Sequence, residues 1–387
     1  MNTDRFDSLT ADELRANGSL KWSEYPNMIG AFIAEMDFGT APEVHHAIEE
    51  AVSRNAFGYV PSRVTDELRD ACSMWQREQY GWEVRGDDIY PVADVLTILE
   101  LSIRLFSTPG SPVIALTPTY MPFLTLPPAW GHPVVEVPLI EANATWTLDL
   151  DAIDQELARG ARVVILCNPG NPTGHVFESA QLVALSAVVE RHNGFVFADE
   201  IHAPLVYSGT THVPYASVSP AARAHTITAT SAAKGWNIPG LKCAQAIIAD
   251  SRIASTWAAS TPRAEEGAST LGIIANIAAY RHGLPWLTDV VSYLDENRRA
   301  LGAALRERIP EIRYHTPQAT YLSWLDCRDL KIGENPAVFF QDHSGVMTTS
   351  GLACGAVGAG YLRFNFALPR PIIHDAVEQM ADALAQR

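Results

Sequence analysis

Apolar residues between about Asp94 and Ala249 fall into short continuous runs rather than into strict alternation. The runs are PVIALT at 112–117, VVILC at 163–167, FVFAD at 195–199, TITAT at 226–230 and CAQAIIA at 243–249. Helix-like segments separate them, and unbroken apolar runs are typical of strands that are covered on both faces. The pattern predicts an α/β fold in which a mostly parallel sheet is flanked by helices.

The two ends of the chain follow other patterns. After residue 249 the sequence becomes helical and then contains two strand-like segments and a closing helix, at 275–309, 321–326, 361–367 and 376–387. The opening segment precedes the first predicted strand and ends in a helix signal, TAPEVHHAIEEAV. We therefore predict a large domain over 46–280, a smaller α+β domain over 281–387, and an N-terminal segment, 1–45, that packs with the smaller domain.

Length and charge narrow the possible classes of function. The chain has 387 residues, which suffices for a full core and two lobes. It carries 28 basic and 44 acidic side chains, and the resulting net charge of -16 repels a phosphate backbone. We therefore expect no nucleic-acid partner.

Cysteine usage and hydropathy indicate the cellular compartment in which the protein works. The five cysteines are scattered and show no C-x-x-C spacing, which argues against a disulfide framework and against a zinc site. This usage fits a reducing cytoplasm. No apolar run approaches the roughly 18 residues that a membrane span requires, so we expect no membrane partner.

Candidate site residues follow the predicted strands, because ligands of parallel sheets bind beyond the carboxyl ends of the strands. The polar segments in this position are Thr119 and Tyr120, Asn168–Gly174, Asp199–His202 and Ser231–Lys234. In the second of these, two Asn-Pro pairs and two glycines form a rigid turn that can present the Asn171 amide to a ligand. An ordinary turn at the end of a strand is the alternative.

Asp199 ends an apolar strand, where a carboxylate is costly unless it meets a cation or a hydrogen-bond donor. It could bind a metal together with His202, but no third ligand stands at short spacing, and we predict no metal site. Capping of the following segment is the plain structural alternative.

The motif S-x-x-K at Ser231–Lys234 admits two chemical interpretations. In the first, Ser231 is an acylated nucleophile, but that chemistry also needs a downstream K-T-G, which neither Lys242 nor Lys331 provides. In the second, Lys234 forms a Schiff base with a carbonyl cofactor, which requires a partly desolvated amine. The chain has only four lysines, so a lysine placed there merely for solubility explains the motif poorly.

The motifs in their order resemble those of fold type I pyridoxal-phosphate enzymes, the aspartate aminotransferase superfamily. They are N-P-x-N-P-T-G, D-E-I-H, S-x-x-K-G-W-N-I-P-G-L-K and L-R-F-N-F-A, and the resemblance covers nearly the whole chain. Within that superfamily, further segments resemble the cystathionine β-lyase branch of MalY/PatB type, the carbon–sulfur lyases. These segments are SLKWSEYP, AEMDF, FGY, PTYMPF, DEIHAPLV, TYLSWLD and SGV.

The resemblance implies a role for each matching residue around pyridoxal 5'-phosphate. Lys234 is the Schiff-base lysine, and Asp199 keeps the pyridine nitrogen protonated so that the ring can accept electrons. Asn171, helped by His202, bonds the ring hydroxyl oxygen, and Tyr120 stacks on the ring.

The match to the family is less regular at the residues that would contact the cofactor phosphate. Ser231 and Lys242 match phosphate contacts, and backbone contacts from Ala93 and Asp94 are implied where the family usually carries a glycine. An acidic side chain at Asp94 repels a phosphate unless it turns away, and Ala233 stands where a hydroxyl is common.

Two further matches concern the substrate and the assembly. Arg363, with Asn171, matches the guanidinium that grips the substrate α-carboxylate in two parallel bonds. Tyr59 matches the tyrosine that reaches the cofactor phosphate of the neighbouring subunit, which implies a homodimer with shared active sites.

The implied activity is α,β-elimination of a sulfur-containing amino acid such as cystathionine, which gives a thiol, pyruvate and ammonia. Lys234 removes the α-proton, and Lys234 or Tyr120 protonates the leaving thiolate. An aminotransferase would use the same residues. A third possibility is a protein of this fold with an added regulatory binding role.

Overall fold

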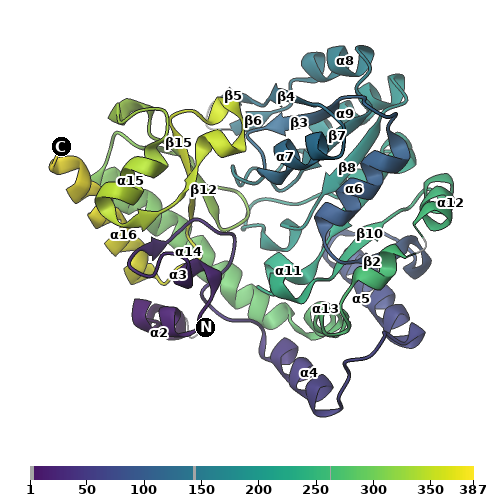
Figure 1. The fold of residues 1–387 in the computed structure, drawn as a ribbon, viewed down its shortest axis with the longest axis horizontal. Helices are drawn as coiled ribbons and strands as arrows, with labels where there is room; N and C mark the ends of the chain where they lie inside the picture. Colours follow the sequence, from purple (N-terminus) through teal and green to yellow (C-terminus); the bar gives the residue numbers. More distant parts are fainter. Residues whose placement is uncertain (1–3, 143–144, 262) are drawn as a thin grey trace.

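The computed structural model describes residues 4–142, 145–261 and 263–387, so the first three residues of the predicted N-terminal segment lie outside it. Figure 1 shows a large helix-flanked sheet beside a smaller group of strands and helices from the C-terminal part of the chain. The purple N-terminal segment lies next to the yellow C-terminal elements. In these described ranges no helix is both long enough and apolar enough to cross a membrane.

The large sheet has seven strands in the order β2-β10-β9-β8-β7-β3-β4. Their bounds are Ile89–Val92 for β2, Val113–Thr117 for β3, Val134–Pro138 for β4, Val163–Cys167 for β7, Phe195–Asp199 for β8, Thr226–Thr230 for β9 and Ala244–Ile247 for β10. Neighbours from β4 to β9 pair in parallel, whereas β10 runs antiparallel to both β9 and β2. The predicted mostly parallel sheet is confirmed, and the hydrophobic pattern missed β2 and β4.

Alternate residues of the central strands enter two separate cores. On β7, Val163 and Ile165 pack on the side of helices α6 and α12, while Val164 and Leu166 pack on the side of α8 and α9. These helices span Val95–Phe106, Ser251–Ser260, Leu150–Ala158 and Ser179–Arg191. Because both faces are covered, polar residues have no place within the strand, and this explains the unbroken apolar runs of the sequence.

The smaller sheet has the order β11-β12-β15-β14, with β11 at Arg313–Tyr314, β12 at Leu322–Asp326, β15 at Tyr361–Asn365 and β14 at Thr349–Ser350. Helices α14, Leu284–Arg308, α15, Pro336–Ser344, and α16, Arg370–Ala385, pack around it. Strand β1, Ile29–Gly30, pairs in parallel with β13, Val346–Met347. This pairing joins the opening segment to the C-terminal part, and the domain boundaries at 45/46 and 280/281 stay predictions.

The remaining helices complete the large sheet's surroundings and the N-terminal segment. They are α1 (Asp4–Asp7), α2 (Ala11–Ala16), α3 (Leu20–Ser23), α4 (Pro42–Ser53), α5 (Ser62–Tyr80), α7 (Pro122–Ala129), α10 (Pro220–Ala224), α11 (Ala232–Gly235) and α13 (Thr270–His282). Strands β5 (Ile140–Ala142) and β6 (Thr145–Thr147) pair antiparallel in a separate small sheet.

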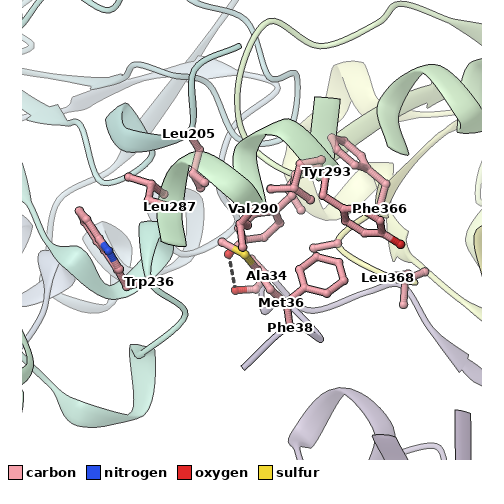
Figure 2. Packing of buried hydrophobic residues seen from close by; sticks show 14 of the residues in the cluster. Ala34, Met36, Phe38, Leu205, Trp236, Leu287, Val290, Tyr293, Phe366 and Leu368 are labelled. Atoms are coloured by element: carbon pink, nitrogen blue, oxygen red, sulfur yellow. Dashed lines mark hydrogen bonds between the residues drawn. The ribbon is translucent and has the colours of Figure 1, made fainter. Parts of the chain in front are cut away.

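A buried ion pair and an apolar cluster hold the N-terminal segment in place. Lys21 Nζ lies 3.1 Å from Asp37 Oδ1, and it also donates to the carbonyl of Ala367 at 2.9 Å. Figure 2 shows Ala34, Met36 and Phe38 among buried residues of α14 and of the chain after β15. The ring of Phe38 meets Tyr293 edge to face at 5.1 Å. The stretch around Ala34 is therefore anchored by polar and apolar contacts, which matters because it borders the site.

Candidate active site

A cavity of about 650 Å³ lies beyond the carboxyl ends of β7, β8 and β9. Its lining includes all but one of the predicted site residues, namely Ala93, Asp94, Tyr120, Asn171, Asp199, His202, Ser231, Lys234, Lys242 and Arg363. Three neighbouring parallel strands end at the same edge of the sheet, so segments that are far apart in sequence meet there. Tyr59 is the predicted residue that does not line the cavity.

Lys234 lies on the short helix α11, which begins directly after β9. The helix starts at Ser231, whose hydroxyl accepts from the Ala233 amide at 3.0 Å and donates to the Cys243 carbonyl at 2.6 Å. Lys234 Nζ donates to the Ala34 carbonyl at 2.8 Å. Burial lowers the pKa of this amine to about 8, so its neutral form is a minor species near neutral pH but far more populated than in an ordinary lysine. A neutral amine is what attack on a carbonyl requires.

Asp199 ends β8 and is only 3 % exposed. Its Oδ1 accepts from the Ile201 amide at 3.1 Å, and its Oδ2 lies 3.8 Å from Cys167 Sγ. Burial raises the pKa of the carboxyl to about 7. No α-helix begins at Asp199, and no group of residues in the described ranges could hold a metal ion. A buried carboxylate at this place fits a protonated ring nitrogen as its partner.

Arg363 lies on β15, is 2 % exposed and reaches from the smaller sheet to the turn after β7. It donates to Asn171 Oδ1 at 3.0 Å, to the Phe32 carbonyl at 2.6 Å and to Thr349 Oγ1 at 3.0 Å. Its Nε is buried and has no hydrogen-bond partner among the residues that the structure describes. All three partners are neutral, so the guanidinium charge is left for an anion in the cavity, and a carboxylate matches its fork.

We predict that Arg363→Lys weakens transition-state binding by about 2 to 4 kcal/mol, because a lysine supplies the charge without the two parallel bonds. The measurement is kcat/KM for a thioether amino acid and for the same compound with its carboxylate converted to an amide. The loss should appear with the carboxylate only. An equal loss with both compounds would show that Arg363 merely bridges the two sheets.

His202 and Tyr120 border the same cavity and both stay neutral. Burial lowers the pKa of His202 to about 3, and its buried Nδ1 has no hydrogen-bond partner in the described part of the chain. Burial also raises the pKa of Tyr120, and the negative charge of Asp199 raises it further. The Tyr120 ring stands edge to face with Phe123 at 5.4 Å. Tyr120 therefore keeps its proton and can act as a donor, and His202 can bond an oxygen without adding charge.

Near the N-terminus of α6, the Asp94 side chain turns onto its own helix. Its Oδ1 caps the helix by accepting from the Thr97 amide at 2.9 Å, and its Oδ2 pairs with Lys242 Nζ at 3.1 Å. The negative charge at this end of the cavity is thereby compensated. The Ser231 hydroxyl proton is already given to a carbonyl. The phosphate contacts of Ala93, Asp94, Ser231 and Lys242 stay predictions.

The opening segment contributes site groups that sequence reasoning did not single out. Backbone carbonyls of Phe32 and Ala34 bind Arg363 and Lys234, and Glu35 lines the cavity beside them. A backbone carbonyl leaves no signature in the residue type. Glu35 does leave one, because it and Asp37 are the two charged residues of the otherwise apolar stretch AFIAEMDF.

The sheet order, the lysine after β9 and the carboxylate that ends β8 define a fold type I pyridoxal-phosphate-dependent transferase fold. Comparison with protein families agrees with this class. The family model described as aminotransferase class I and II matches residues 27–380, and the chain belongs to this family.

Individual relatives match over nearly their whole length. The cystathionine beta-lyase of Corynebacterium glutamicum is 34% identical, with 96% of this chain and 98% of that protein covered. Protein MalY of Escherichia coli K12 is 31% identical, with 91% and 90% covered. The solved structure of the PLP-bound C-S lyase from Staphylococcus hominis matches with a TM-score of 0.90 at 26% identity, and covers 98% of this chain and 97% of that chain.

Proposed function

We propose that the protein is a pyridoxal-phosphate-dependent carbon–sulfur β-lyase that cleaves cystathionine or related cysteine conjugates to a thiol, pyruvate and ammonia. The observation that carries this proposal is the meeting of Lys234, Asp199 and Arg363 in one cavity. An amine with a lowered pKa, a buried carboxylate and an unpaired guanidinium are the groups that amino-acid chemistry on this cofactor requires. The full-length similarity to a cystathionine beta-lyase supports elimination as the reaction.

When bound, pyridoxal phosphate supplies an aldehyde and a ring that can store an electron pair. The chain's own residues bind and move protons around it. Asp199 accepts a hydrogen bond from the ring nitrogen, and Arg363 with Asn171 orients the α-carboxylate of the substrate. Lys234 Nζ, with its lowered pKa, takes the α-proton as a neutral base. The proton for the leaving thiolate comes from Lys234 or from the Tyr120 hydroxyl.

An aminotransferase would use the same residues, so the two reactions are separated by their products. The purified protein is incubated with cystathionine, with and without a keto acid. Release of pyruvate and thiol in the absence of keto acid is the result expected of a lyase. Turnover that depends on the keto acid would assign the protein as a transaminase instead.

We also propose a homodimer with shared active sites. Tyr59 is 99 % exposed and Phe57 is 63 % exposed on the same connection between α4 and α5. The Thr270 hydroxyl donates to the Gly58 carbonyl at 2.8 Å and holds this loop against α13. Two large aromatic side chains on a fixed, exposed loop support a contact with a second copy of the chain.

We predict that mixing Tyr59→Phe with Lys234→Ala restores activity above the average of the two parents. In the hybrid dimer, one site combines the intact residues of both chains. The lost phosphate contact is worth only about 1 to 3 kcal/mol, so the assay uses limiting cofactor. An active monomer in sedimentation would contradict the proposal.

The proposed compartment is the cytoplasm. The five cysteines are free, and four of them are buried. Such thiols need no oxidising environment and fit a reducing one.

A further inference from the structure

The charged groups around the cavity can be paired almost completely. Its lining holds the carboxylates of Glu35, Asp94 and Asp199 and the cations of Lys234, Lys242 and Arg363. Asp94 is paired with Lys242. In the proposed reaction, Asp199 faces the ring nitrogen, Arg363 binds the substrate carboxylate, and Lys234 bonds the cofactor or carries the α-proton, so it is a cation for only part of the cycle. Glu35 is then the carboxylate of this lining that has no cation.

The position of Glu35 is fixed through its backbone. Its carbonyl accepts from Lys21 Nζ at 3.3 Å and from Asn365 Nδ2 at 2.7 Å. The preceding carbonyl, of Ala34, accepts from Lys234 and from the Tyr321 hydroxyl at 2.9 Å. Anchored on both sides, this backbone holds the side chain at the wall of the cavity.

The carboxylate of Glu35 remains available to bind a ligand. Within the ranges that the structure describes, it takes part in no ion pair and in no side-chain hydrogen bond, although Lys21 next to it is paired with Asp37. The charge of Glu35 raises the pKa of Lys234, so the carboxylate lies within electrostatic reach of the reacting amine. Partial burial of a carboxylate without a partner carries a desolvation penalty, and a cation on the ligand would offset that penalty.

The segment that carries Glu35 also contacts the carboxylate-binding group. Arg363 donates to the Phe32 carbonyl, three residues before Glu35. A substrate held by its α-carboxylate at Arg363 is therefore bound next to segment 32–35, which lines the same cavity. The amino group on its α-carbon is engaged by the cofactor, so a cation that meets Glu35 belongs to another part of the substrate, and the leaving thiol is that part.

We propose that Glu35 binds an ammonium group carried by the leaving thiol, so the preferred substrates are cysteine thioethers with a cation at the far end. This inference rests on the proposed lyase function. Cystathionine belongs to the class, because its leaving thiol bears an amino group on the third carbon from sulfur. Glu35 is a specificity-determining residue in this account, and bond cleavage itself does not need it.

Two substrates of equal chain length test the proposal. S-(3-aminopropyl)cysteine ends in an ammonium group, and S-butylcysteine ends in a methyl group at the same place. The wild-type protein should prefer the first in kcat/KM, measured by pyruvate release. Glu35→Gln should lower kcat/KM for the ammonium substrate by about tenfold or more, because it removes one member of a partly desolvated charge pair. S-butylcysteine carries no charge that could meet the carboxylate and should change by less than about threefold.

Glu24→Gln is the matched control, because it removes the same charge from an exposed position of the N-terminal segment. It should leave the ratio between the two substrates unchanged. An equal loss with both substrates in Glu35→Gln would mean that Glu35 acts only through Lys234. If the wild type shows no preference for the ammonium substrate, that measurement alone overturns the proposal.

A binding measurement keeps the test separate from the proposed function. Both amino acids are titrated into the cofactor-loaded wild type and Glu35→Gln, and the change in cofactor absorption gives the two dissociation constants. If no thioether yields pyruvate, the lyase assignment fails, but the ratio of the two dissociation constants still tests the role of Glu35. A ratio that is the same in both proteins would refute the role of Glu35.

Discussion

Lys234→Ala is expected to lower turnover by about 10⁴-fold, the upper end of what a positioned acid or base contributes. The loss is large because one amine both holds the cofactor and takes the α-proton, and neither of the other two nearby lysines is free to replace it. Lys21 is engaged in a buried ion pair, and Lys242 is paired with Asp94. Pyruvate release under saturating cofactor measures the effect.

Lys331→Ala is the control, because Lys331 is exposed and lies outside the cavity lining. It should turn over like the wild type. Borohydride reduction of the wild type followed by peptide mapping should place the cofactor label on Lys234. A label on Lys242 would show that the assignment of the lysine is wrong.

Asp199→Asn is expected to retain the cofactor and to lose about 10³-fold in turnover, near the upper range for truncating one partner of a buried charge pair. A neutral amide cannot hold a proton on the ring nitrogen, so the ring becomes a poor electron store. The 3 % exposure of Asp199 leaves little room for water to take over this role. Absorption of the bound cofactor and kcat, measured on the same sample, separate binding from catalysis.

Asp87→Asn removes a comparable charge from an exposed position and should have no effect on kcat. Near-wild-type turnover of Asp199→Asn would mean that the carboxylate only bonds the Ile201 amide. Loss of the cofactor together with activity would point to a structural role for Asp199.

The apolar runs of the sequence were sufficient to predict the sheet and the edge at which the site lies. Strands β7, β8 and β9 are covered on both faces, so each produced a run that is visible without any partner. Asn171, Asp199 and Lys234 then had to meet, because neighbouring parallel strands end together. The two missed strands have weaker signals, since β2 contains a proline and β4 is a partly exposed edge strand.

Which groups pair across the cavity was decided only by the tertiary structure. Arg363 bonds Asn171 across 192 positions of sequence, and Lys234 bonds the Ala34 carbonyl across 200. Hydrophobic periodicity records only whether a residue faces the core, so it cannot show which distant residue lies opposite. For the same reason, the sequence could not show that Glu35 lacks an ion-pair partner within the described ranges. Its charge is visible in the sequence, but its lack of a cation depends on how the anchored N-terminal segment folds over the end of the sheet.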